Sequence, residues 1–345
     1  MKGSKKLLIL SILCIVAGLL LTAFSGVRDG GYLKKLLGDA GNARLQEKKT
    51  VEVTESFHSL RVKEFSADVQ LLPSEDGGCR VVYGEDEYSR CEVSVENGVL
   101  TVERVAENSS RTGFIVFEET LPVCVYLPAG SYKELSVSCT SGDVISSGDF
   151  SWDAANVETG SGSIRLEDLS AKELHLKSTS GDIKLEELSA DALSAESGSG
   201  DIKLRGCSAS SVTLQSTSGR QKADSLICSG DGSFHAGSGD IELEDSSFRA
   251  LRVSATSGDV SLQQTSCSAE TAVETGSGNI RLHKAAAESF DVHTTSGSVK
   301  GSVRGSVDFI VESTSGSVRT RGGVRGGAEC RVKTGSGDVD LEADR

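Results

Sequence analysis

The chain has 345 residues, a formal net charge of −14 at pH 7, and only 5% aromatic residues against 39 glycines. An acidic surface of this kind repels phosphate backbones, which excludes DNA and RNA as expected partners. The scarcity of aromatic side chains argues against a core built around large rings. It favours a narrow core of aliphatic and small side chains.

Residues 1–25 have the pattern of an export segment. Lys2, Lys5 and Lys6 precede an uncharged, mostly apolar run over 7–24. This run of 18 residues is close to the roughly 20 that a spanning helix needs. The lysines favour a cytoplasmic N-terminus, so the rest of the chain should lie outside. We expect a signal anchor, that is, a transmembrane helix of a single-pass cell-membrane protein. The alternative is a signal peptide cleaved after Ser25 and a secreted product.

Residues 26–49 are polar with a short leucine-rich patch, and we expect a juxtamembrane stalk there. Residues 50–130 alternate apolar and polar side chains, as in SLRVKEFSADVQLLP and VENGVLTVERV, with turn signals such as SEDGG between the runs. This pattern predicts strands. It shows no fixed repeat length, so we interpret the region as a β-rich N-terminal cap.

Residues 131–345 contain one motif repeated eleven times. A Ser-Gly pair recurs at steps of 19 to 21 residues, and usually Asp, Ser or Asn and then Ile or Val follow it. Apolar residues occupy the positions four and six before each serine and three and five after it, whereas the positions between are polar or small. Alternation of this kind is typical of strands with one buried face. The serines are Ser141, Ser161, Ser180, Ser199, Ser218, Ser238, Ser257, Ser277, Ser296, Ser315 and Ser336.

Such a unit cannot fold alone, because ordering its backbone costs more than its few inward side chains contribute. Neighbouring repeats must therefore stack. The predicted fold is all-β: a single-stranded, right-handed parallel β-helix, or β-solenoid, of eleven rungs of 19–20 residues each. In the Ser-Gly-Asp turns we expect glycine to adopt positive φ and Asp to bond nearby backbone. The last rung ends in LEADR, and this charged tail either shields the open end or pairs there with another molecule.

The residue before each serine alternates between Thr and Gly over most of the repeat, from Thr140 to Thr295. Duplication of a two-rung unit explains this alternation, and so does a requirement of each Thr for a small neighbour across the rung boundary.

The SGDI and GSGSI rungs, the LPAG segment before them and the early SADVQLLP strand together resemble the bacterial putative-adhesin family, a β-strand-repeat domain of unknown function that is auto-transporter-adhesin-like. The resemblance covers about residues 50–345. It implies a β-helix exported to the cell envelope, and it brings no established functional residues. Relatives often carry an N-terminal membrane segment and are associated with envelope maintenance or stress responses.

Three residue types could carry chemistry. A column of aspartates, two residues after the serines, either forms turns or binds calcium between stacked carboxylates. Cys79 and Cys91 are candidates for a disulfide. Cys139, Cys207 and Cys330 lie in inward columns and should behave as small apolar residues, while Cys228 and Cys267 lie two rungs apart, too far for a bridge. The aspartates are Asp143, Asp182, Asp201, Asp240, Asp259 and Asp338.

None of His58, His175, His235, His283 and His293 lies in a catalytic or metal-binding motif, and His175, His235 and His293 fall on outward positions. We therefore assign no catalytic, cofactor-binding or metal-binding residue and expect no cofactor. Regular steps also leave no room for the long loops that form the clefts of β-helix enzymes, so we expect no enzyme.

The expected function is that of a non-catalytic extracytoplasmic interaction protein, an adhesin or a cell-envelope scaffold. Its partner would be an envelope, surface or membrane protein or a glycan. One alternative is a membrane-anchored sensor or accessory protein of a cell-envelope stress response. Another is a polysaccharide-active β-helix enzyme.

Overall fold

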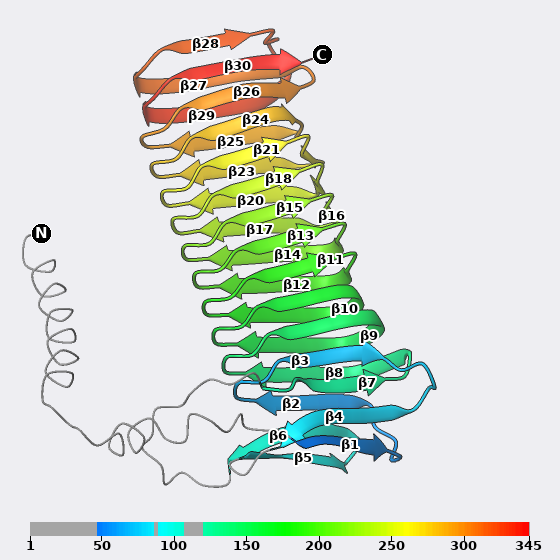
Figure 1. The fold of residues 1–345 in the computed structure, drawn as a ribbon. Helices are drawn as coiled ribbons and strands as arrows, with labels where there is room; N and C mark the ends of the chain where they lie inside the picture. Colours follow the sequence, from blue (N-terminus) through cyan, green and yellow to red (C-terminus); the bar gives the residue numbers. More distant parts are fainter. Residues whose placement is uncertain (1–46, 86–88, 107–119, 345) are drawn as a thin grey trace, which may run out of the picture. The chain divides into compact units, whose positions relative to one another are not determined.

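A computed structural model describes residues 47–85, 89–106 and 120–344 (Figure 1). Throughout these ranges the regular structure is β, with thirty strands joined in one sheet and no helix. The all-β parallel solenoid predicted from the repeat is therefore confirmed. The predicted signal anchor and nearly all of the predicted stalk lie outside the described residues. Among the residues that are described, no helix is long and apolar enough to span a membrane.

The body of the molecule is a parallel stack in which every rung contributes one strand to each of two long ladders (Figure 1). Short strands form a third ladder at one corner of some rungs. Strands that end before a Ser-Gly turn are β8 (Gly130–Cys139), β9 (Val144–Thr159), β10 (Ile164–Ser178), β12 (Ser189–Ser197), β14 (Ser208–Ser216), β17 (Asp231–Ala236), β20 (Ala250–Ala255), β23 (Glu270–Thr275) and β25 (Ser289–Thr294). Strands that begin after a turn are β11 (Ile183–Glu186), β13 (Ile202–Arg205), β15 (Gln221–Asp224), β18 (Ile241–Glu244), β21 (Val260–Gln263), β24 (Ile280–Ala285) and β26 (Val299–Arg304), while β9 and β10 continue through both ladders. The short corner strands are β16 (Ile227–Cys228), β19 (Ser247–Phe248) and β22 (Ser266–Cys267).

The register of the ladders matches the columns of the sequence repeat. Ile183 pairs with Ile202, and Leu185 pairs with Leu204. Both columns are buried, with Ile183 at 0% and Leu185 at 1% exposed. A continuous aliphatic core therefore runs along the axis of the stack, as the alternation predicts.

The glycine of most Ser-Gly pairs has a different role from the one expected, and the expected positive φ occurs only at Gly316 and Gly337, with 145° and 157°. These glycines are not the positive-φ residues of the central rungs. Their backbones lie directly on each other, so a Cβ built on Gly181 would come within 1.9 Å of the Gly162 carbonyl oxygen. Real Cβ atoms essentially never approach another atom more closely than 3.0 Å. The requirement for glycine therefore comes from the close stacking of the turns.

Left-handed backbone occurs instead at a second corner, seven residues after the serines of seven successive rungs, from Ser161 to Ser277. This column is occupied mostly by residues other than glycine, with φ between 47° and 63°, at the cost of some strain. Its members are Asp168, Glu187, Gly206, Ser225, Asp245, Gln264 and Lys284.

The alternation of Thr and Gly before each serine has a packing reason. A Cβ on Gly198 would lie 2.3 Å from the carbonyl oxygen of Thr179 in the preceding rung, and Gly160 has the same relation to Thr140 at 2.4 Å. A threonine rung therefore has to be followed by a rung with glycine at this position. This agrees with the interpretation that Thr needs a small neighbour.

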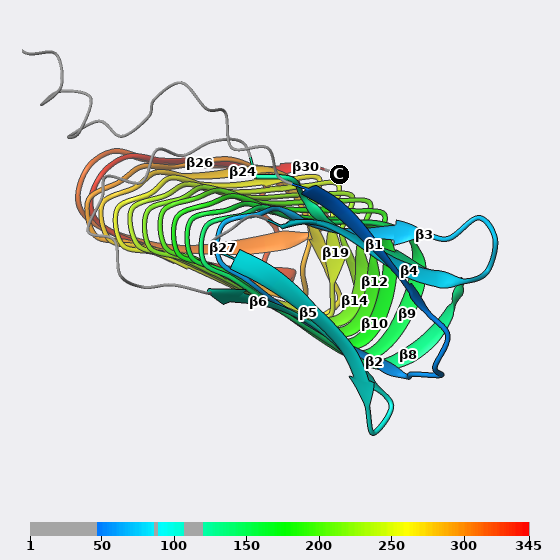
Figure 2. The ribbon, with the colours of Figure 1, turned by 60° about the horizontal axis from the view of Figure 1, so that its bottom comes forward.

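The N-terminal end begins with a rung that is out of sequence order. The strands before β8 are β1 (Glu47–Val53), β2 (Ser59–Glu64), β3 (Val69–Pro73), β4 (Cys79–Glu85), β5 (Ser89–Glu96), β6 (Val99–Ala106) and β7 (Val123–Leu127). β2 and β3 pair in parallel with β8 and β9, although β7 is the strand that precedes β8 in sequence. β6 and β7 lie on the other side of β2 and β3. Antiparallel strands β1, β4 and β5 complete this end (Figure 2).

The rung at β2 and β3 carries a copy of the turn that the eleven-fold count missed. Asp68 accepts a hydrogen bond from the backbone N–H of Asp143 at 2.8 Å, and Val69 pairs with Val144. The segment Ser66–Val69 reads SADV, with Ala67 where the other turns have glycine. Because this copy lacks the Ser-Gly pair, it does not stand out in the sequence repeat.

The C-terminal end also departs from sequence order. β29 (Ala328–Ser336) and β30 (Val339–Asp344) pair with β25 and β26, so the last rung of the sequence is inserted one place early. β27 (Val307–Ser315) and β28 (Val318–Arg321) lie outside it and form the end of the stack (Figure 1). The expectation that the LEADR tail covers the open end is therefore wrong.

Core composition explains the inverted order. The inserted rung offers Val339 and Leu341, which are 1% and 0% exposed, to the core. At the equivalent positions the outer rung has Val318, which is 49% exposed, and Thr320, which is also exposed. In this ladder, burying Leu341 and leaving Thr320 at the end gains apolar burial. In the other ladder the outer rung has the larger apolar side chains, with Val307 and Phe309 opposite Ala328 and Cys330.

The inverted order predicts a large effect of one exchange between these two side chains and a small effect of the other. Leu341→Thr should lower the free energy of unfolding by about 2–3 kcal/mol, because it removes a fully buried apolar side chain. Thr320→Leu at the exposed end should change it by less than about 0.5 kcal/mol. Urea unfolding of both variants tests this prediction. A larger effect at Thr320 than at Leu341 would show that the rungs stack in sequence order.

Candidate functional site: a groove beside Trp152

The aspartate column joins successive turns through hydrogen bonds. One carboxylate oxygen of each Asp accepts a hydrogen bond from the backbone N–H at the same position of the neighbouring rung. Asp182 accepts from the N–H of Asp201 at 3.0 Å, and Asp240 accepts from the N–H of Asp259 at 2.9 Å. Asn279 continues the series with its side-chain oxygen, which accepts the Ser298 N–H at 3.1 Å. This geometry supports the turn-forming interpretation of the column and uses oxygens that calcium would need.

Neighbouring groups lower the pKa of several of these carboxyls. The pKa of Asp338 lies below its ordinary value because the backbone N–H and the hydroxyl of Ser317 donate to it. At Asp259, desolvation raises the pKa, but hydrogen bonds from Asn279 and Arg281 outweigh it and lower the pKa overall. The charged form is therefore the one that holds the turns together.

Replacing Asp259 separates the two interpretations. Asp259→Ala should lower the free energy of unfolding by about 1–2 kcal/mol, since the Asn279 N–H loses its acceptor. Asp259→Asn should cost less, because an asparagine oxygen performs the same role at Asn279. Thermal unfolding with and without millimolar calcium measures both effects. A calcium-dependent rise in melting temperature that Asp259→Asn abolishes would contradict this prediction.

The cysteines are free thiols, and seven of the eight described ones are buried. The disulfide expected between Cys79 and Cys91 is therefore wrong: each thiol lies among buried side chains, and burial raises their pKa values to about 11 and about 12, respectively. Cys139, Cys207 and Cys330 are at most 6% exposed in inward columns, as expected. Cys228 and Cys267 occupy one column with Phe248 between them.

Burial raises the pKa of the Cys330 thiol to about 12 from the ordinary value of 9.0. A pKa raised by folding means that the stability linked to this proton is complete below pH 9.0 and is lost as the pH rises towards about 12. Cys330→Val should therefore make unfolding less sensitive to pH in this window than it is in the unmodified chain. Equal slopes in urea titrations of the two proteins between pH 8.5 and 10.5, a range of about 2 units, would contradict this.

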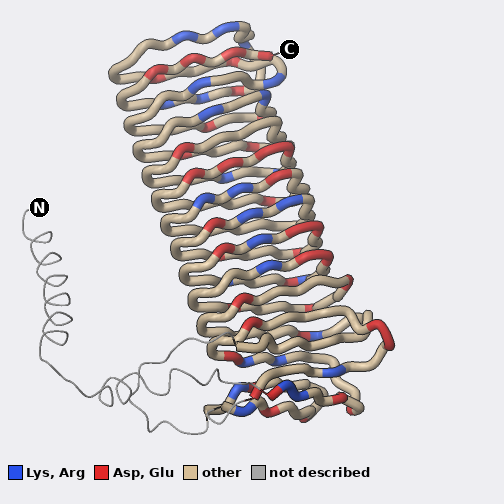
Figure 3. The backbone as a smooth tube through the Cα atoms, viewed as in Figure 1, with Lys and Arg blue, Asp and Glu red and all other residues tan. Residues whose placement is uncertain are grey.

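In the described ranges, the histidines and the potential metal ligands do not cluster into a catalytic or metal-binding site. The Nδ1 atoms of His58 and His235 lie 2.9 Å and 2.8 Å from the hydroxyls of Ser59 and Ser254, and His293 lies beside Glu274. Across 47–85, 89–106 and 120–344, no three His, Cys, Asp or Glu side chains are grouped so that they could hold a metal ion. Acidic and basic residues alternate along the rungs instead (Figure 3), in exposed pairs such as Lys203 with Asp201 at 3.0 Å. Exposed pairs of this kind contribute little to stability.

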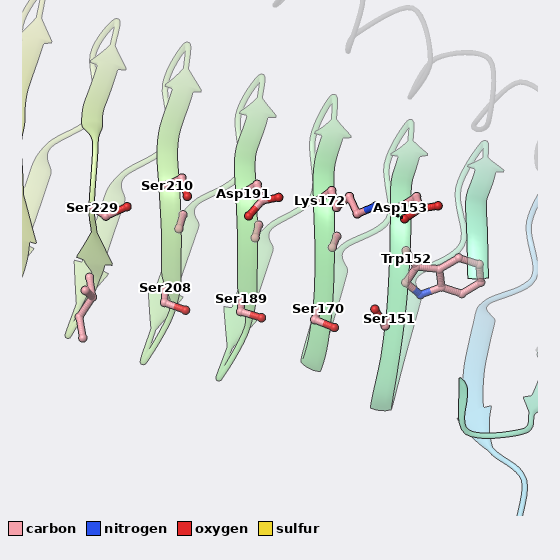
Figure 4. Close-up of a pocket in the computed structure, with 14 residues that line it drawn as sticks. Ser151, Trp152, Asp153, Ser170, Lys172, Ser189, Asp191, Ser208, Ser210 and Ser229 are labelled. Atoms are coloured by element: carbon pink, nitrogen blue, oxygen red, sulfur yellow. Dashed lines mark ion pairs between the residues drawn. The ribbon is translucent and has the colours of Figure 1, made fainter. Parts of the chain in front are cut away.

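A groove of about 480 Å³ runs along one flank of the stack, across the rungs of β9, β10, β12, β14 and β16 (Figure 4). Between its two walls lie three alanines stacked in register, Ala171, Ala190 and Ala209, whose side chains belong to an inward column and are only 7–8% exposed. One wall carries the serines of the preceding column, and the other carries the residues of the following column. The serines are Ser151, Ser170, Ser189 and Ser208, and the opposite wall is Asp153, Lys172, Asp191, Ser210 and Ser229.

The inward column that runs beneath the groove changes side-chain size along the axis. Tyr132 and Trp152 occupy this column in the first rungs and stack at 4.7 Å between ring centroids, with Phe57 stacked beyond Tyr132 at 6.0 Å. In the next three rungs the same column holds alanine. At the far end it holds Cys228 and then Phe248. The alanines therefore leave empty the space that rings fill on either side.

Trp152 forms the aromatic end of the groove and has an unusual environment. Its side chain is 1% exposed, and its indole Nε1 has no hydrogen-bond partner. In Figure 4 the nitrogen lies on the edge of the ring nearest Ser151, on the groove side. A buried donor without an acceptor costs about 1–3 kcal/mol. The nitrogen has less than 1 Å² of accessible surface, so a molecule in the open groove does not reach it.

The walls combine free polar groups with one ion pair. Lys172 pairs with Asp153 at 2.7 Å. Asp191 has no ion pair within the described part of the chain. In the same described ranges, the hydroxyls of Ser189 and Ser208 donate to no other group. The groove was not predicted from the sequence, because serine and alanine are common in β repeats and form no recognised binding motif. The signal was the replacement of Trp by three consecutive alanines ten to eleven residues after the serines.

Comparison with known proteins finds one family model that matches and several solved structures of low sequence identity. The model of the Toastrack DUF4097 family matches residues 57–225 and again 225–342. No curated protein matches the chain. A solved structure described as a putative adhesin from Bacteroides fragilis is 14% identical, with 87% of this chain and 98% of that one covered and a TM-score of 0.36. A structure described as a putative lipid binding protein from Parabacteroides distasonis is 18% identical, with 85% and 96% covered and a TM-score of 0.39. A putative adhesin from the same species is 14% identical, with 86% and 97% covered and a TM-score of 0.36. Since the two matched segments together span most of the sequence, the chain belongs to the Toastrack DUF4097 family.

Proposed function

We propose that this protein is a non-catalytic interaction rod of the cell envelope, adhesin-like in that it binds its partner along the flank of the solenoid. The observation that carries the proposal is the groove beside Trp152, a preformed recess on an otherwise regular rod. Its polar side chains are six serines, two aspartates and one lysine, without a histidine or a cysteine among them. Such a set of groups suits recognition by hydrogen bonding better than it suits nucleophilic catalysis.

The regularity of the stack supports this proposal. From β10 to β26 the successive rungs pair in register, and the connections between the strands are short. Enzymes need a site enclosed enough to exclude water and to hold a transition state. A flank built from uniform rungs instead offers a long, repetitive surface of the kind that solenoid proteins use for binding.

We further propose that residues 1–25 hold the rod on the outer side of a cytoplasmic membrane. The lysines before the apolar run support this orientation. The partner would then be a surface protein or a glycan outside the cell.

Display on a non-adherent bacterium tests the proposed function with the full chain. Cells that produce it should bind to surfaces coated with glycans or matrix proteins more strongly than cells with an empty vector. Protease added outside intact cells should remove both the rod and the adhesion. Cells that carry the rod on their surface and bind no better than the vector control would overturn the proposal, and so would a rod that the protease reaches only after lysis.

A further inference from the structure

We propose that the C-terminal end of the stack is a self-association surface, through which two copies of the chain pair end to end about a two-fold axis. The last rung, formed by β27 and β28, is the contact surface of each copy. This inference does not depend on the proposed function.

The last rung leaves the backbone edges of both ladders open. Within the described ranges, β27 pairs only with β29, and β28 pairs only with β30. Unpaired N–H and C=O groups along a strand edge are a template for a further strand. The strands of the two ladders point in opposite directions (Figure 1). A two-fold axis along the strands therefore sets β27 of each copy antiparallel to β28 of the other, so that all the open edges are paired at once.

The same rung exposes apolar side chains. Three of the six exposed large apolar residues in the described part of the chain lie here, namely Ile310 at 44%, Val318 at 49% and Val324 at 38%. Phe309 and Val311 of β27 are only partly buried against the core. The inward columns thus end without a covering layer, and the same columns of a second copy would supply one.

The charges of the two edge strands are complementary. The outward side chains of β27 include Asp308 and Glu312, whereas those of β28 are Arg319 and Arg321. Figure 3 shows the basic residues on the outermost strand of the stack. In the two-fold arrangement each residue keeps its distance from the turn at 315–317. Glu312 of one copy therefore lies across from Arg321 of the other and diagonal to Arg319. By symmetry, each contact occurs twice.

The local charge balance also favours this end as the contact between copies. The whole chain carries a net charge of −14, but residues 299–344 have seven basic and seven acidic side chains. Two such ends approach each other without the repulsion that two acidic flanks would meet. A head-to-tail stack that continued both ladders would instead set β27 against β5, which exposes Glu92 and Glu96. End-to-end pairing is therefore the more favourable arrangement.

The size of the surface predicts a weak dimer. The nine residues of β27 span about 30 Å at about 3.3 Å per residue, and the facing sheets lie about 10 Å apart. With the outward side chains included, the end offers on the order of 500 Å² to a partner, below the roughly 800 Å² of a standard interface. We therefore expect a dissociation constant on the order of 100 µM.

Sedimentation velocity of the full chain in detergent tests the proposal. Between about 5 and about 500 µM we expect a shift from monomer to dimer without larger species, and a weaker dimer in about 0.5 M salt. A spin label at Lys300 reports the orientation through double electron–electron resonance. Across paired ends the two labels are five rung steps apart, about 24 Å along the axis, and less than about 45 Å apart in all. A head-to-tail assembly would separate them by more than about 60 Å.

Exchange of charges identifies the contact residues. Glu312→Arg alone, and Arg319→Glu with Arg321→Glu, should each weaken association at least tenfold, because each change sets like charges against each other. Mixed in equal amounts, the two variants should associate at least as tightly as the unmodified chain, because all the facing charges then attract. Arg321 also pairs with Asp340 at 3.1 Å within its own copy, but this contact is exposed and contributes little to folding.

The matched control is Glu173→Arg, which makes the same change of charge as Glu312→Arg at an exposed position on the flank of the stack. It should leave association unchanged. A chain that stays monomeric up to about 500 µM would overturn the proposal. Equal effects of Glu312→Arg and Glu173→Arg would contradict it as well, as would association through residues 1–25 or head to tail, which persists in both charge variants. A mixture that stays monomeric, although both variants keep the circular dichroism of the unmodified chain, would exclude pairing of β27 with β28.

Discussion

Gly181→Ala is expected to lower the free energy of unfolding by about 3 kcal/mol, one of the largest effects of any single methyl group in this chain. The added Cβ would lie 1.9 Å from the carbonyl oxygen of Gly162, so the two rungs would have to separate at the turn. Separation would stretch the Asp ladder and the backbone hydrogen bonds on both sides of it. The effect therefore spreads to a rung boundary that several strands share.

The control for this variant is Ser180→Ala, at the exposed neighbouring residue. It should change the free energy of unfolding by less than about 0.5 kcal/mol. Urea unfolding followed by circular dichroism measures both. Equal stabilities of Gly181→Ala and Ser180→Ala would mean that the turns are not in contact, which contradicts the stacking described above.

Arg104→Met is expected to lower the free energy of unfolding by about 3–5 kcal/mol. The Arg104 side chain is 4% exposed, and its Nε donates to Glu64 at 3.0 Å while its Nη1 donates to the Gly84 carbonyl at 2.6 Å. Glu64 also accepts the Phe65 N–H at 2.9 Å. Removing the guanidinium leaves the Glu64 carboxylate buried without its counter-charge.

Adding Glu64→Gln to Arg104→Met tests this reason. The neutral amide no longer needs a counter-charge, and its oxygen still accepts the Phe65 N–H, so the double variant should recover at least half of the loss. Thermal and urea unfolding of the single and double variants form the measurement. A double variant less stable than Arg104→Met alone would show that the cost arises from lost packing and not from the unpaired charge.

The repeat predicted the fold because its signal is redundant. Each inward column occurs in many rungs, so a single irregular rung such as the one at Ser218 does not hide the period. The register follows from the same redundancy, because pairing equivalent residues such as Ile183 and Ile202 keeps every inward column buried. Close stacking of the turns was not predicted, because a glycine in a turn, such as Gly181, is usually explained by a positive φ angle. The left-handed corner at Glu187 was missed because it uses residues that are not typical of that conformation.

The order of the rungs at both ends could not be read from the repeat. Two rungs with the same columns fit the same place in a stack. The difference between Leu341 and Thr320 favours burial of the last rung, whereas Phe309 opposite Cys330 favours the other order. A comparison of core residues between the last two rungs would have indicated the inversion. At the other end, the copy at Asp68 was hidden by alanine in place of glycine.

The candidate site was outside the reach of motif analysis for a different reason. Its polar groups are six serines, two aspartates and one lysine, residue types that are common on the outward face of any rung. Buried Arg104 and Glu64 were also missed, although the alternation of Leu100, Val102 and Arg104 places the arginine on an inward position. A charged residue in an inward column is a signal that a search for catalytic motifs does not use.

The central claim is that the rungs stack in parallel, with the last two in inverted order. Spin labels attached through unnatural amino acids at Lys184, Arg319 and Asp340 lie in one outward column, and double electron–electron resonance measures their separations. Lys184 and Asp340 are seven rung steps apart, and Arg319 is one step farther. At about 4.8 Å per step, we expect about 34 Å to Asp340 and about 38 Å to Arg319. The reverse order of these distances would contradict the inverted end, and two distances below about 20 Å would contradict the solenoid itself.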